Sequence, residues 1–108
     1  DAKGWSGLHL AAQNGSDQIV SVLLQAHASA DLARPDGRTA LMDACVSGNE
    51  RCVKLLLEAD ASIALADDAG MTALLLCARH GSEHALLKVL QKGRETNIET
   101  MQQQSNRG

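Results

Sequence analysis

Residues 37–57 read GRTALMDACVSGNERCVKLLL, and this stretch holds the pattern that decides the fold. Thr39 stands just before the first apolar segment, and Gly48 separates that segment from the second. A threonine hydroxyl accepts a hydrogen bond from the free backbone N–H groups at the start of a helix. Glycine is common just after a helix, because it adopts the left-handed conformation without steric cost. The stretch therefore predicts two short helices, over 40–47 and 50–59.

The same pattern occurs three times, at an offset of 33 residues. Glycine recurs at positions 4, 37 and 70 and at 15, 48 and 81, and leucine recurs at 8, 41 and 74 and at 24, 57 and 90. Twelve positions of the first 33 residues are identical in the next 33. The pattern predicts further helices over 7–14, 17–26, 73–80 and 83–92. One such helix pair cannot bury its apolar side alone, whereas stacked pairs share a continuous core.

We therefore predict an all-α solenoid of stacked helix-turn-helix units joined by β-turn connections. The units cover residues 1–33, 34–66 and 67–98, and a polar C-terminal tail, expected to be frayed, covers 99–108. Two positions weaken the pattern. His27 and Asp60 stand where a glycine would end the second helix, so each must take a left-handed conformation at some cost or end the helix in another way.

Composition excludes several classes of function. The net charge is −3, no basic stripe is interleaved with aromatic residues, and nucleic acid is therefore not an expected partner. No apolar run approaches the roughly 20 residues that span a bilayer. Three cysteines at irregular spacing argue against a disulfide framework and for a reducing, intracellular compartment, cytoplasmic or nuclear. The chain begins at Asp1 rather than at Met, so we expect it to be part of a longer protein.

The 33-residue unit resembles the ankyrin repeat. The residues that carry the resemblance in the three repeats are Asp1, Gly4, Ser6, Leu8, His9, Ala11, Ala12, Gly15, Ile19, Val20, Val22, Leu23, Leu24 and Ala28; then Gly37, Thr39, Leu41, Ala44, Gly48, Val53, Leu55, Leu56, Leu57 and Ala61; then Asp67, Gly70, Thr72, Leu74, Ala78, Gly81, Leu90, Gly93 and Asn97. The match covers residues 1–98. It implies a module that binds other proteins, and it implies that His9 ties a turn to a helix. The chain departs from the family where Gly7, Ala40 and Ala73 replace a proline.

Two patterns could carry chemistry, and a structural role accounts for both. His80 and His84 fit an inverted zinc-protease motif, but Gly81 separates the two helices on which they lie. The cysteines Cys45, Cys52 and Cys77 occupy small or apolar positions of the repeat, where a thiol packs as a small hydrophobic group. We therefore expect no catalytic residue, metal or cofactor, and no enzyme.

The resemblance implies that partners dock on a concave face formed by the turn tips and first helices. Several apolar residues fall in columns of that face where a bland stack would be polar, and exposed apolar clusters usually mark interaction sites. The predicted partner-binding residues are Trp5, Leu10, Arg38, Asp43, Val46, Met71, Leu76, Arg79 and His80. An extended or helical peptide with apolar residues and some acidic character would suit this set.

The same residues are compatible with three alternatives. Flanking repeats or domains of the parent chain could cover the face, and Trp5 could pack on an upstream repeat. The apolar stripe or the open end of the stack could also drive self-association. The chain could instead be a regulatory module within a larger multidomain protein.

Overall fold

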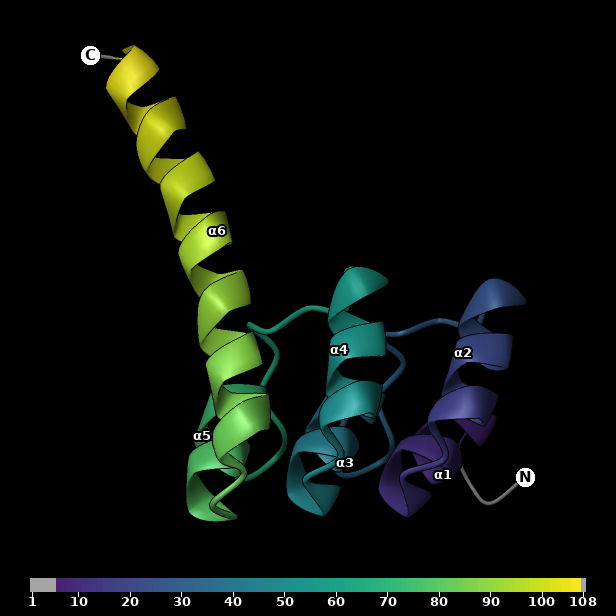
Figure 1. Cartoon of the computed structure of the whole chain (residues 1–108). Coiled ribbons are helices and arrows are strands. Elements are labelled where there is room, and N and C mark those ends of the chain that lie inside the picture. Colours follow the sequence, from purple (N-terminus) through teal and green to yellow (C-terminus); the bar gives the residue numbers. More distant parts are fainter. Residues whose placement is uncertain (1–5, 108) are drawn as a thin grey trace.

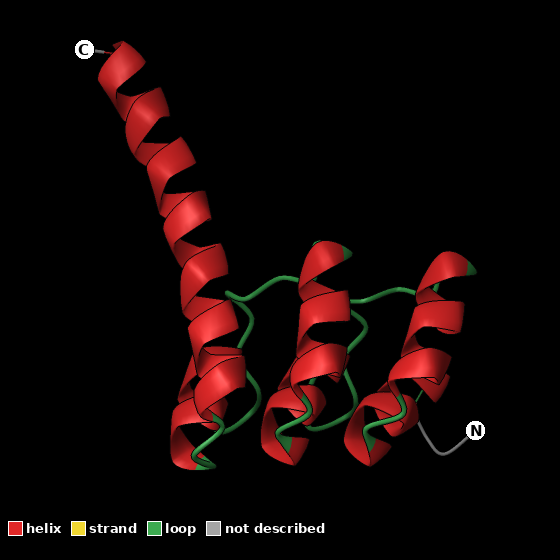
Figure 2. Ribbon diagram, viewed as in Figure 1, coloured by secondary structure: helices red, strands yellow, loops and turns green. Residues whose placement is uncertain are grey.

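The computed structural model describes the backbone of residues 6–107 and the side chains of residues 6–95. Within this range the chain forms three helix pairs that stand side by side in sequence order (Figure 1). The helices are α1 (Gly7–Asn14), α2 (Asp17–Gln25), α3 (Ala40–Ser47), α4 (Glu50–Glu58), α5 (Ala73–Arg79) and α6 (Glu83–Arg107). Helices and loops account for the described chain, apart from an isolated β-bridge between Ala66 and Thr72 (Figure 2). The predicted all-α repeat solenoid is confirmed.

Each first helix begins at the predicted hydroxyl residue. The Ser6 Oγ accepts a hydrogen bond from the His9 N–H (3.3 Å), and Thr39 and Thr72 cap α3 and α5 in the same way. Such a cap typically contributes about 1 kcal/mol of helix stability. In the second helix of the middle repeat, Asn49 supplies the cap through its side-chain oxygen. Local side-chain chemistry therefore decides where these helices start.

The helix ends also follow the sequence, with one strained position in each of the first two repeats. Gly15 and Gly48 end α1 and α3 in the left-handed conformation. His27 (φ 67°) and Asp60 (φ 62°) adopt the same conformation after α2 and α4, although neither is glycine. The prediction that these two residues take a left-handed cap is confirmed.

The core runs through all three helix pairs. Its buried members are mostly Ala, Leu, Val and Cys side chains, which allow the thin layers to approach closely. Polar side chains also cross between the repeats: the Ser47 Oγ donates to the Ala12 carbonyl (3.1 Å), and the Ser82 Oγ donates to the Cys45 carbonyl (3.1 Å). Each repeat is therefore joined to the next by apolar burial and by hydrogen bonds at the loop between its helices.

The last helix differs from the prediction. The repeat pattern predicts a helix over 83–92 and a frayed tail, but α6 continues to Arg107 and projects beyond the stack (Figures 1 and 2). Gly93, in the position of His27 and Asp60, lies inside the helix. Residues 94–107 contain no glycine or proline, so no local signal ends the helix there.

The strained cap at His27 gives a test of this account. We expect His27→Gly to stabilise the chain by about 0.5–1 kcal/mol, because glycine takes a positive φ without the penalty that a side chain meets. Urea unfolding followed by circular dichroism would measure the change. His27→Ala is the control and should give no gain, since alanine meets the same penalty. A glycine variant less stable than the parent would contradict the strain argument.

Candidate interaction surface

The turn tips and the ends of the first helices form one surface, here called the inner face. Of the residues predicted for it, Arg79 and His80 are exposed, and Arg38, Val46 and Met71 are half-buried. Val46 and Met71 also pack against the core, so each presents only part of its side chain. Trp5 lies outside the described residues. The structure thus places five predicted residues on the inner face of the second and third repeats.

Asp67 holds the turn tip of the third repeat in shape. Its Oδ1 accepts hydrogen bonds from the N–H groups of Ala69 and Met71, both at 2.9 Å. Its Oδ2 lies 3.7 Å from the Nε of Arg38, on the neighbouring turn. The hydrogen bond from the Met71 N–H is the main reason that the pKa of Asp67 is lowered. The ionised carboxylate therefore joins two adjacent turn tips and orients Arg38 between them.

Leu76 was predicted as an exposed anchor, and that prediction is wrong. Its side chain is 0% exposed, whereas the adjacent Leu75 is 47% exposed. The column of Leu76 faces the preceding repeat, so the middle repeat covers it. Leu75 points toward the open C-terminal end of the stack, where no further repeat covers it in the described chain.

Asp43 was also predicted as exposed, and it is buried, with 2% of its area accessible. It stands in the same column as Leu76 and faces the first repeat. Its Oδ1 lies 3.6 Å from a terminal nitrogen of Arg34, which itself donates to Asp36 (2.9 Å). Its Oδ2 has no hydrogen-bond partner among the described residues. Burial raises the pKa of Asp43 to about 6, although the guanidinium groups of Arg34 and Arg38 oppose the rise.

Sequence reasoning missed Arg34, although the repeat pattern contained a signal. Aspartate occupies this column at Asp1 and Asp67, and leucine occupies the column of Asp43 at Leu10 and Leu76. The middle repeat changes both columns together, to Arg34 and Asp43. A paired change from acid to base and from apolar to acid is what a buried ion pair requires.

Leu10 is 46% exposed, but it belongs to a different surface from the one predicted. Its column is the column of Asp43 and Leu76, which is buried wherever a preceding repeat is present. Leu10 therefore lies on the N-terminal end of the stack rather than on the inner face.

His9 does what the family resemblance implied. Its Nδ1 accepts a hydrogen bond from the Ser6 N–H (3.1 Å), and its Nε2 lies 3.1 Å from the Arg38 carbonyl oxygen. A carbonyl only accepts, so Nε2 carries the proton and donates it. Burial lowers the pKa of the His9 imidazole, which favours this neutral form. The side chain thereby ties the start of α1 to the next turn.

The cysteines are core residues, as predicted. Cys45, Cys52 and Cys77 are free thiols with 0% of their area exposed. Burial raises the pKa of Cys52 to about 11, so its thiol stays protonated. His80 follows α5 and His84 lies in α6, on different elements as expected. No group of three metal-ligating side chains occurs in the part of the chain that the structure describes.

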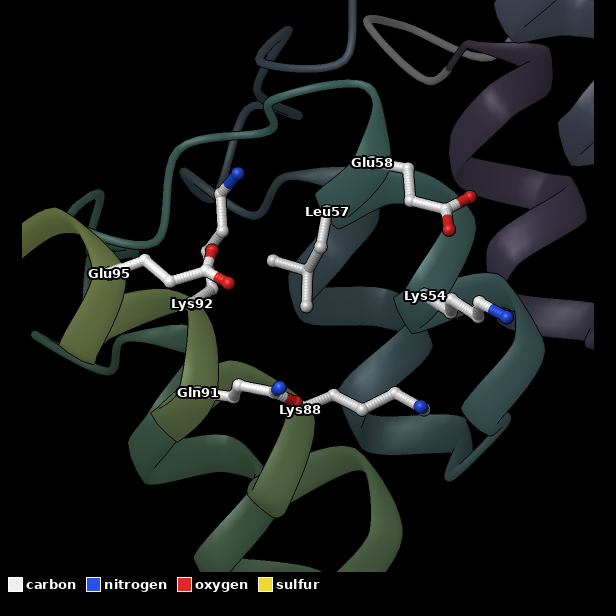
Figure 3. Close-up of a pocket in the computed structure, with 7 residues that line it drawn as sticks. All are labelled: Lys54, Leu57, Glu58, Lys88, Gln91, Lys92 and Glu95. Carbon is white, nitrogen blue, oxygen red and sulfur yellow. The ribbon is translucent and has the colours of Figure 1, made fainter.

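The opposite side of the stack carries a shallow hollow between α4 and α6 (Figure 3). It measures about 250 Å³ and is lined by Lys54, Leu57, Glu58, Lys88, Gln91, Lys92 and Glu95. Its cations already have acidic neighbours, since Lys88 lies 3.6 Å from Glu50 and Lys92 lies 3.2 Å from Asp60. Both charge signs line the hollow, so it favours no ligand of one charge.

These features define a class of protein: a solenoid of short helix pairs with hydroxyl-capped first helices, joined by turns that share one face. A family model for ankyrin repeats in three copies matches residues 8–102. The chain belongs to the ankyrin repeat family, whose fold is known as a non-catalytic protein-interaction module.

A solved structure gives the same fold. The crystal structure of the human ASB11 ankyrin repeat domain is similar, with a TM-score of 0.80 and 28% identity. The match covers 82% of this chain but only 40% of that domain. A search of curated proteins gives no match. No helix among the described residues is long and apolar enough to cross a membrane.

The adjacent residues Leu75 and Leu76 test the corrected orientation of α5. Leu76→Glu should unfold the chain or lower its stability by at least about 3 kcal/mol, because it places an unpaired charge in the core. Leu75→Glu, one position earlier, should retain the parent's helical circular dichroism signal and midpoint. Thermal unfolding of both variants would measure this. Equal effects of the two changes would contradict the orientation.

The raised pKa of Asp43 predicts a pH dependence that Asp43→Asn isolates. The folded state binds this proton more tightly than the unfolded state, so its contribution is complete below about pH 4 and is lost as pH rises through about 6. Relative to the Asn variant, the parent should lose on the order of 1–3 kcal/mol between those limits. Urea unfolding at several pH values would measure the difference. His9 titrates in both proteins and cancels. Parallel pH profiles would show that Asp43 does not titrate in this way.

Proposed function

We propose that this chain binds a protein or peptide partner through its inner face. The observation that carries the proposal is the mixture of side chains there: half-buried Val46 and Met71 lie in a row that also contains Arg38, Arg79 and His80. Arginine and partly exposed apolar residues on a rigid backbone are typical of binding hot spots. The hydrogen bonds of Asp67 keep the neighbouring turn tips ordered before any partner arrives, which reduces the entropy lost on binding.

The chemistry of this face favours a particular kind of partner. Arg79 and His80 are exposed cationic or titratable groups, and Met71 is a flexible apolar side chain that adapts to different contacts. A peptide that presents an apolar residue to Met71 and Val46 and an acidic residue to Arg79 would satisfy both. The buried free thiols support an intracellular setting, in which such an adaptor would act.

Self-association is a second candidate, and a different observation favours it: large apolar residues are exposed at both ends of the stack. Coverage of the inner face by another part of a longer protein is a third candidate, and it would leave the same residues in a binding role within one chain.

A peptide selection with a matched control tests the inner face. Peptides selected from a random library on the parent chain would be measured by titration against Arg79→Glu and against Lys54→Glu. Both changes reverse an exposed cation, but Lys54 lies on the opposite side, at the α4–α6 hollow. We expect Arg79→Glu to weaken binding about tenfold or more, and Lys54→Glu to leave it unchanged. Equal losses, or a loss only with Lys54→Glu, would move the site away from the inner face.

A further inference from the structure

The N-terminal end of the stack exposes three apolar residues in columns that are buried elsewhere. Leu10, Ile19 and Val22 are 46%, 54% and 62% exposed. The residues in the columns of Leu10 and Ile19 have almost no exposed area in the later repeats: Asp43 2%, Leu76 0%, Cys52 0% and Ala85 1%. These columns are therefore the surface with which each repeat contacts the preceding one. We call Leu10, Ile19 and Val22 the N-terminal end face.

The C-terminal end of the stack shows the converse. Leu75 is 47% exposed and Leu90 is 38% exposed, whereas Met42 and Leu57 in the same columns are 1% and 6% exposed. Ala78 is exposed where Cys45 is fully buried. These columns contact the following repeat. We call Leu75, Ala78 and Leu90 the C-terminal end face, and the part of α6 beyond residue 92 projects past this region along its own axis (Figure 1).

The two end faces are complementary, because the junction between the second and third repeats is built from the same columns. That junction joins Met42, Cys45 and Leu57 on one side to the columns of Leu76, Ala85 and Val89 on the other. Two separate copies would bring Leu75 and Leu90 against Leu10, Ile19 and Val22 in the same arrangement. The interface would therefore extend a packing that the chain already uses.

A hydrogen bond at the edge of this junction can also be repeated. The Ser82 Oγ donates to the Cys45 carbonyl across the junction between the second and third repeats. Ser16 occupies the position of Ser82, and the carbonyl of Ala78 occupies the position of Cys45. A second copy would place the same donor opposite the same acceptor.

Ion pairs would not be repeated. Asp17 pairs with Arg51 (3.3 Å), and Glu50 pairs with Lys88 (3.6 Å), each across a junction between repeats. Glu83 stands in the column of Asp17 and Glu50, but Gln18 and Val22 stand where the arginine and lysine would be. The new interface has neither an ion pair nor a like-charge contact there. It therefore depends on apolar burial and should change little with salt.

We infer that copies of this chain associate head to tail, the N-terminal end face of one copy adding to the C-terminal end face of the next as a fourth repeat. Such an interface joins two different surfaces, so it does not close after two copies and allows chains of copies to form. It uses different residues from the inner face, and either idea can fail without the other.

Sedimentation equilibrium of the 108-residue chain, from about 10 µM to about 1 mM, tests the inference with one variant on each end face. Leu10→Glu blocks the N-terminal end face, and Leu75→Glu blocks the C-terminal end face. We expect the average mass of the parent to rise with concentration beyond that of a dimer. Each variant alone should remain a monomer. An equimolar mixture of the two should form dimers and stop there, because it contains one intact copy of each face.

Leu65→Glu is the matched control. Leu65 and its equivalent Leu32 are 39% and 49% exposed, so this column is open in the middle of the stack as well as at its end. The control should associate as the parent does, and circular dichroism should show that all variants keep the parent's helical signal. A parent that stays monomeric to about 1 mM would overturn the inference. So would a variant that dimerises alone, or a mixture that stays monomeric.

Discussion

The rest of the structure depends on burial of one side of each first helix against the helix pair before it. The columns of Ala40 and Leu76, which are 1% and 0% exposed, illustrate how completely this contact excludes water. A helix of seven or eight residues is marginal alone. Its stability here comes from the neighbouring pair, so stability passes from repeat to repeat as a sum of contacts between neighbours. The same dependence explains why both ends of the stack carry apolar residues that the middle repeat covers.

The positions of the helices could be predicted because local chemistry determines them. Thr39 and Gly48 act within one turn of the backbone, and a repeat offset of 33 residues carries the assignment to the other units. The roles of His9 and of the buried cysteines were predictable for a related reason, since each is defined by a column of the repeat. The end of α6 was not, because Gly93 stops a helix only when the chain after it turns to begin another repeat.

The inner face was predicted only in part, because burial in a solenoid depends on the neighbour as well as on the residue. Leu75 and Leu76 are adjacent leucines, and their side chains point about 100° apart around the helix. Sequence alone does not show which of them faces the preceding repeat, and the prediction of an exposed anchor fell on the wrong one. Arg79 and His80 were placed correctly because the end of a first helix is exposed in every repeat. Asp43 could have been identified only by noticing that Arg34 changes with it.

The two junctions within the stack use different chemistry, and this difference has a physical consequence. The junction between the second and third repeats packs Leu76 and Cys77 in an apolar setting. The junction between the first and second repeats instead buries Asp43 near Arg34, in the column that holds leucine in the other repeats. A buried ion pair gives little net stability, because desolvation offsets its attraction, yet loss of either partner alone leaves an uncompensated charge. The first junction therefore tolerates replacement of both residues better than replacement of one, and it discriminates against a repeat with leucine at only one of these positions.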